Sequence, residues 1–114
     1  MKPKVVIIVD KPQWAYENIA KAIVHHLSGE YEFEIRYGNE IDFINKNHAR
    51  WDLIFSMGWK WLSPREIRTP REKTVSVLHS FRTLKGGSTE EWGEYLNKRY
   101  CGVGAVNDEL HFMF

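Results

Sequence analysis

The fold is decided by residues 4–27, which read KVVIIVDKPQWAYENIAKAIVHHL. The run Val5–Val9 is β-branched without polar alternation, and a strand that is apolar on both sides must be covered on both faces of a sheet. Asp10 and Pro12 break the strand, and apolar residues then return at helical spacing. A buried parallel strand, a tight turn and an amphipathic helix make the first half of a βαβ unit. The expected apolar face of this helix consists of Ala15, Ile19, Ala22, Ile23 and Leu27.

The remaining chain alternates strand and helix patterns. We expect further strands at 31–37, 53–57, 74–78 and 100–106, and the first of these alternates apolar and charged residues, which is typical of a position near a sheet edge. Expected helices cover 41–50, with Asp42 as its cap, and 63–69, 88–99 and 108–114. The pattern predicts a single Rossmann-like domain over residues 1–114. It is a three-layer α/β/α sandwich of about five mostly parallel strands, with the first strand in the middle between the second and third.

Composition excludes several classes of partner. The formal charge is +1, with 16 basic and 15 acidic residues well mixed along the chain, so no basic footprint for nucleic acid stands out. The single cysteine, Cys101, lies in an apolar run, which favours a core position and a reducing compartment. The longest apolar run has the five residues of the first strand, too few for a membrane span or a signal peptide, so we expect a cytoplasmic protein.

Known cofactor motifs are absent from the turns where they would belong. The turn at residues 10–14, DKPQW, has no glycine for a pyrophosphate, and residues 85–88, KGGS, have the P-loop types in the wrong order. A phospho-acceptor receiver domain would need more acids than Asp10 after the first strand. His25 and His26 are adjacent on a helix and point about 100° apart, so they form no metal site. We therefore expect no metal and no bound cofactor.

A ring of polar and aromatic residues follows the carboxyl ends of the expected strands, where open parallel sheets bind their ligands. Its members are Lys11, Gln13 and Trp14 after the first strand, Trp59, Lys60 and Trp61 after the third, His79, Ser80 and Arg82 after the fourth, and Asn107 and Asp108 after the fifth. His79 is the strongest candidate, because an imidazole and the Arg82 guanidinium would flank a cleft whose aromatic faces stack on a sugar ring. Structural alternatives remain, since Trp14 could staple its helix and Trp59 or Trp61 could cap the core.

Four segments resemble one enzyme family in the correct order along the chain. Residues 10–20 (DKPQWAYENIA), 51–54 (WDLI), 77–82 (VLHSFR) and 104–110 (GAVNDEL) are similar to the amino-terminal domain of family-four glycosyltransferases of the GT-B type. In that family two Rossmann-like domains face each other across a cleft. The amino-terminal domain receives the acceptor, and the carboxyl-terminal domain holds the nucleotide sugar.

The resemblance implies roles for several residues and also the absence of one domain. Trp14, His79 and Arg82 would line the acceptor side, with His79 catalytic beside the transferred sugar, and the acceptor would be a sugar or glycan, either soluble or membrane-associated. The chain departs from the family pattern because the donor-binding domain is missing, so we expect a fragment that is inactive alone. No metal is implied, and the nucleotide-sugar donor would be bound by the missing domain.

Two other functions stay open. The chain could be a non-catalytic, self-associating α/β module that pairs through its carboxyl-terminal edge, where Phe112, Met113 and Phe114 need a cover from the sheet or from another chain. It could also be a small flavodoxin-like domain with Trp59 and Trp61 as walls for a flavin, although the turn after the first strand lacks a phosphate-binding sequence.

Overall fold

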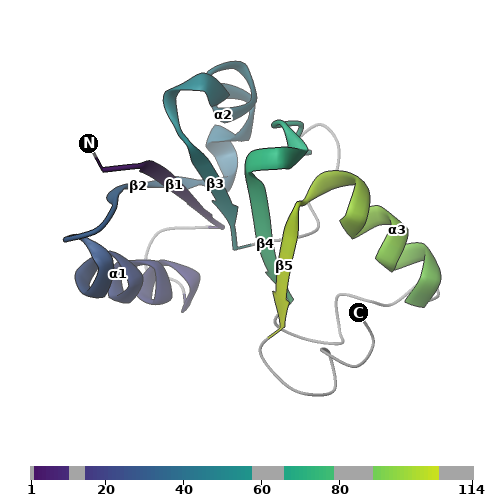
Figure 1. The fold of residues 1–114 in the computed structure, drawn as a ribbon, viewed down its shortest axis with the longest axis horizontal. Coiled ribbons are helices and arrows are strands. Elements are labelled where there is room, and N and C mark those ends of the chain that lie inside the picture. The colour runs from purple at the N-terminus through teal and green to yellow at the C-terminus, as the bar shows by residue number, and fades with distance from the viewer. Residues whose placement is uncertain (1, 11–14, 58–65, 79–88, 106–114) are drawn as a thin grey trace.

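Five parallel strands form one sheet in the order β2-β1-β3-β4-β5 (Figure 1). The computed structural model of the chain describes residues 2–10, 15–57, 66–78 and 89–105. The strands are β1 (Lys4–Val9), β2 (Glu32–Tyr37), β3 (Leu53–Ser56), β4 (Thr74–Leu78) and β5 (Gly102–Ala105). The prediction of a largely parallel Rossmann-like sheet is confirmed. β1 is an interior strand flanked by β2 and β3 as expected, although the middle of the sheet is β3.

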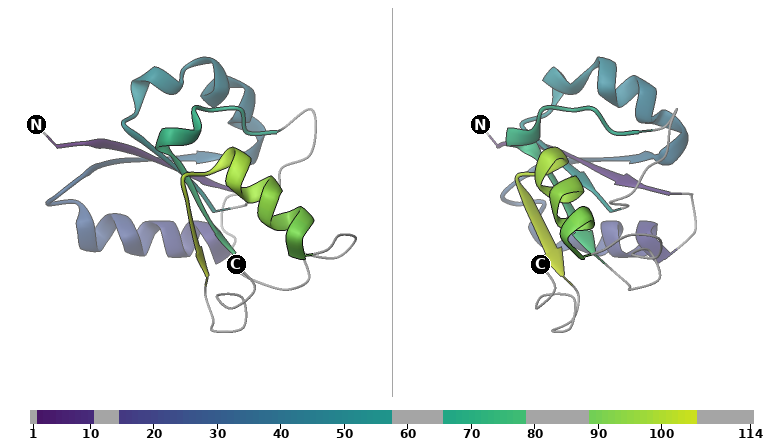
Figure 2. Two further views of the ribbon diagram at one scale, coloured as in Figure 1. Left: turned by 45° about the vertical axis from the view of Figure 1, so that its right-hand side comes forward. Right: turned by 90° about the vertical axis from the view of Figure 1, so that its right-hand side faces the viewer.

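Helices cover both faces of this sheet, as Figure 2 shows. The helices are α1 (Ala15–Leu27), α2 (Ile41–Lys46) and α3 (Thr89–Arg99), with 3₁₀ turns η1 (Gly38–Glu40), η2 (His48–Arg50) and η3 (Arg71–Lys73). α1 and α2 lie on opposite faces. The end of α3 lies on the α2 side, because the Arg99 guanidinium donates to the carbonyl of Ile67, a member of the α2-side core. This arrangement gives the three expected layers.

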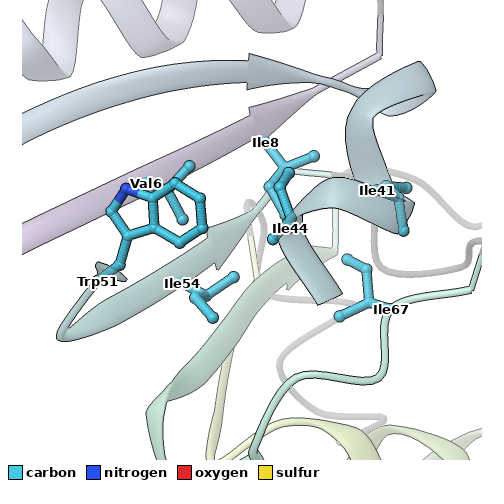
Figure 3. Packing of buried hydrophobic residues seen from close by; sticks show 7 residues of the cluster. All are labelled: Val6, Ile8, Ile41, Ile44, Trp51, Ile54 and Ile67. Carbon is cyan, nitrogen blue, oxygen red and sulfur yellow. The ribbon is translucent and has the colours of Figure 1, made fainter. Parts of the chain in front are cut away.

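The side chains of β1 divide the core into two halves. Val5, Val6, Ile7, Ile8 and Val9 are all 3% exposed or less. The α2-side half joins side chains from β1, α2, the residues leading into β3, β3 itself and the irregular segment before β4 (Figure 3): Val6, Ile8, Ile41, Ile44, Trp51, Ile54 and Ile67. The α1-side half consists of Val5, Ile7, Val9, Ala20 and Met57. A strand apolar on both faces therefore has a helix on each, as its sequence predicts.

Asp52 fixes the start of β3 beside the start of β1. Its carboxylate Oδ2 accepts the backbone N–H of Lys4 at 2.8 Å, and its own N–H donates to the Lys4 carbonyl at 2.8 Å. Trp51, the preceding residue, is buried at 4% exposure in the α2-side core. The Trp-Asp pair before the third strand thus has a structural role, which sets the register between two strands far apart in sequence.

The predicted apolar face of α1 is correct at Ile23 and wrong at Ile19 and Leu27. Ile19 and Leu27 are 43% and 38% exposed, whereas Ala20 and Glu17 are buried at 0% and 4%. Tyr16, Ile23 and Val24 pack partly buried against the α1-side core. The helix is turned so that Glu17 faces inward, because its carboxylate finds polar partners beside the sheet.

Three other local predictions are also corrected. Residues 66–70 are irregular, so the described part of the helix expected at 63–69 is absent, and Pro70 occupies the position before η3. Glu40 occupies the N-cap position of α2 in place of Asp42, and no side chain caps this helix because η1 runs directly into it. Cys101 is exposed and does not belong to the core. It precedes an edge strand, which has a neighbour on one side only among the described residues.

Candidate functional site

The carboxyl ends of all five strands lie along one side of the sheet, because every pairing is parallel. We call this side the carboxyl edge, as distinct from the outer strands β2 and β5. This edge is where open α/β sheets bind ligands. The candidate residues follow four of the strands along the chain, after their last residues Val9, Ser56, Leu78 and Ala105. The candidates themselves lie outside the described residues: Lys11, Gln13, Trp14, Trp59, Lys60, Trp61, His79, Ser80, Arg82, Asn107 and Asp108. Their convergence on one concave face stays a prediction, as do the helix expected at 108–114 and a cover for Phe112, Met113 and Phe114.

A buried carboxylate lies beside this edge, between α1 and β2. The Tyr37 hydroxyl, at the end of β2, donates to Oε2 of Glu17 at 2.6 Å. Lys21 pairs with Oε1 of the same carboxylate at 3.1 Å, one helical turn further along α1. Only 4% of Glu17 is exposed. The hydrogen bond from Tyr37 to Glu17 raises the pKa of the phenol, because ionisation would place two negative charges together.

The Glu17 carboxylate supports the edge rather than facing a ligand. Its burial leaves almost no surface for contact with a dissolved molecule. It sits in the first turn of α1, directly after residues 11–14, which carry three candidate binding residues. The pair of Tyr37 and Glu17 therefore fixes one end of the candidate loop against β2.

A second set of polar contacts closes the end of β2. The Tyr37 N–H donates to Oε2 of Glu40 at 2.9 Å, and the Arg36 guanidinium donates to the other oxygen of Glu40 at 2.9 Å. Arg36 also contacts Glu34, and hydrogen bonds to these two carboxylates raise the pKa of the guanidinium. This network holds the turn η1 against the strand, so the backbone at this corner of the edge is fixed.

Asp10 marks the end of β1 at the same edge. Its backbone carbonyl accepts the N–H of Gly38 at 3.3 Å, which extends the pairing of β1 with β2 by one step. Burial, and then the negative charge of Asp10, raise the pKa of Tyr16. Two phenols and two carboxylates therefore lie near the point where the first candidate loop begins. They belong to Asp10, Tyr16, Glu17 and Tyr37.

Sequence reasoning missed Glu17 and Tyr37. The sequence carries one usable signal, which is an acid in the first turn of the helix after β1 together with a tyrosine at the end of the neighbouring parallel strand. Their contact depends on the rotation of α1 and on the pairing of Val9 with Tyr37. Both depend on tertiary contacts between elements that are distant in sequence.

Two hollows lined by described residues lie away from the carboxyl edge. A polar cavity of about 240 Å³ is lined by Lys4, Glu32, Phe33, Glu34, Arg50 and Trp51. An apolar groove of about 220 Å³ runs between α1 and the sheet, over Val5, Leu53 and Phe55. Both lie toward the amino ends of β1 and β3. The described lining of the apolar groove lacks the polar groups expected of a sugar site, and the described lining of the polar cavity includes none of the candidate loop residues.

The described ranges also hold no cluster of three histidine, cysteine or acidic side chains able to bind a metal ion. Within those same ranges, no helix is long and apolar enough to cross a bilayer.

Comparisons with known proteins give no relative. No family model matches the chain, and neither a curated protein nor a solved structure is significantly similar to it.

Proposed function

We propose that this chain is the acceptor-binding domain of a glycosyltransferase that transfers a sugar from a nucleotide-sugar donor. One observation carries the proposal: a five-stranded parallel sheet has its carboxyl ends along one edge, where four candidate loops begin. The four sequence segments that resemble family-four glycosyltransferases include the turns after β1, β4 and β5 and the entry to β3.

The proposed roles follow from the chemistry of the loop residues. Trp14 and Trp59 provide flat apolar faces for a sugar ring, and Lys11, Gln13, Lys60, Ser80, Arg82 and Asn107 provide hydrogen bonds to its hydroxyls. His79, the titratable group of the set, acts beside the sugar being transferred. In this proposal a second domain holds the nucleotide sugar, so the activity to measure in these 114 residues is acceptor binding.

The test is a titration of the labelled 114-residue chain with a panel of mono- and oligosaccharides, followed by backbone amide chemical shifts. We expect saturable shifts at Asp10 and Met57, the described residues that follow β1 and β3 at the carboxyl edge. Lys4 and Leu53, at the opposite ends of the same strands, are the internal reference and should not shift.

A matched pair of variants assigns the binding to the candidate loops. Arg82→Ala should weaken sugar binding at least about tenfold, because it removes a charged hydrogen-bond donor worth roughly 1.5–3 kcal/mol. Arg68→Ala removes a guanidinium that is 66% exposed in the segment before β4, and it should leave binding unchanged. Shifts restricted to the amino ends of the strands, or equal affinities for the two variants, would refute the assignment.

A further inference from the structure

β5 is an exposed edge strand without charge. Its sequence is Gly102-Val103-Gly104-Ala105, and among the described strands it pairs only with β4. Val103 is 36% exposed, Gly104 is exposed, and Cys101 before the strand is exposed as well. An edge strand presents a row of N–H and C=O groups that another strand can pair with.

The other edge of the sheet is protected and β5 is not. β2 carries Glu32, Glu34 and Arg36 at alternate positions, and Arg36 is paired with both Glu34 and Glu40. Charged side chains of this kind keep an edge from pairing with another chain. Residues 100–106, YCGVGAV, contain no charged side chain and no proline. The two edges of one sheet therefore differ in their capacity for association.

The side chains of β5 suit pairing with an identical strand. Gly102 and Gly104 lie beside Val75 and Val77, since a Cβ built on either glycine meets the valine of its partner at 3.4 and 3.8 Å. Both glycines thus face one side of the sheet, and Val103 faces the other. In an antiparallel pair whose two-fold axis passes midway between the two Val103 residues, Val103 lies opposite its own copy and Gly102 lies opposite Gly104. Each small residue meets a small residue, and no charge is buried.

We propose that β5 is a docking strand for a second copy of this chain, with two β5 strands paired antiparallel about Val103 so that the two sheets become continuous. This inference does not depend on the carbohydrate proposal, since it uses none of the candidate loops.

The charges of helix α3 favour a second copy of this chain, rather than an unrelated protein, as the partner of β5. It leads into β5 and carries Glu90 and Glu91 in its first turn and Lys98 and Arg99 in its last turn. Glu90, Glu94 and Lys98 are exposed. A two-fold axis normal to the sheet reverses α3 together with β5, so the two copies of α3 run antiparallel and the acidic half of one is aligned with Lys98 at the basic end of the other. The charges are complementary only in this reversed arrangement.

The first test is sedimentation of the 114-residue chain at about 1–100 μM, the range in which weak homodimers dissociate. We expect wild type to approach twice the 13.5 kDa monomer mass as concentration rises. Val103→Lys should raise the dissociation constant at least about tenfold, because two ammonium groups then stand directly opposite each other. Ile19→Lys, at an aliphatic site on α1 that is 43% exposed, should dimerise like wild type.

A charge exchange tests the two-fold register itself. Val103→Lys and Val103→Glu should each be monomeric, and an equimolar mixture should form a heterodimer, because position 103 faces its own copy only when the axis passes midway between the two. A mixture no more associated than its components would overturn the register.

A measurement on unmodified protein covers the case in which these variants fail to fold. Amide exchange at residues 102–104 should slow as protein concentration rises, while exchange on β2, the other edge, stays constant. Wild type that is monomeric throughout the range, or protection that is independent of concentration, would overturn the proposal.

Discussion

Tyr37 and Glu17 show how one hydrogen bond can hold a loop in place. The bond joins the last residue of β2 to the first turn of α1, the helix that begins directly after residues 11–14. A buried carboxylate that loses a donor keeps its desolvation cost, so the penalty for removing the donor exceeds the value of a typical hydrogen bond.

Tyr37→Phe should lower the free energy of unfolding by about 1–3 kcal/mol, since it removes only the hydroxyl that donates to Glu17. Urea unfolding measures the loss. The matched control is Tyr31→Phe, because Tyr31 also packs against the α1-side core and no hydrogen bond of its hydroxyl occurs among the described residues. We expect that variant to lie within about 0.5 kcal/mol of wild type. Equal losses in the two variants would show that the ring environment, and not the hydrogen bond, matters.

At the scale of elements, strands were more predictable from sequence than the faces of helices. The run Val5–Val9 admits one reading, because five β-branched residues without alternation need cover on both sides. The face of α1 was not predictable, because Ile19 is more apolar than Glu17 and yet Glu17 is buried. Glu17 is buried because it accepts the hydrogen bond of the Tyr37 hydroxyl, which lies on β2. The sequence pattern of α1 alone does not contain this partner. Residue type and topology together predict the candidate loops, and the described residues bear out only the topology.

Helix α2 offers a direct comparison of two neighbouring residues. Ile44 is 0% exposed within the α2-side core, and Phe43 is 38% exposed with the guanidinium groups of Arg36 and Arg50 at 4.8 and 5.5 Å from its ring centre. Ile44→Ala should cost about 2–5 kcal/mol of unfolding free energy, since it leaves a cavity in the core. Phe43→Ala should cost about 1 kcal/mol or less, the value of exposed cation–π contacts. Thermal and urea unfolding of the two variants check the difference, and a larger loss for Phe43→Ala would contradict the packing described.

Across the whole molecule, four tyrosines couple stability to alkaline pH. Burial is the main cause of the raised pKa of Tyr16, Tyr95 and Tyr100, and the hydrogen bond to Glu17 is the main cause for Tyr37. A pKa raised above the unfolded value of 10.0 means that the folded state holds its proton more tightly. The resulting stabilisation is complete below pH 10 and is lost as pH rises through the folded-state values.

We therefore expect the free energy of unfolding to fall as pH rises above about 10, measured by urea unfolding at a series of pH values. Tyr100→Phe should flatten this decline, because Tyr100 is the most deeply buried of the four phenols, with 2% of the residue exposed. The slope against pH is the readout, so a lower baseline stability of the variant does not affect it. Identical slopes for wild type and Tyr100→Phe would exclude this phenol as a contributor.

The all-parallel sheet also determines how the chain can fold in time. No described strand pair is a hairpin, and even the bridge from Ser76 to Ser56 spans 20 residues, while the contact of Lys4 with Asp52 spans 48. Each pairing closes a long loop before it gains any stabilising contact, so the chain loses conformational entropy early in folding. We therefore expect folding to be slow for a chain of this length. β3 and β4, with the shortest loop between them, are the pair expected to meet first, and β1 completes the sheet only after the segment between it and β3 has collapsed.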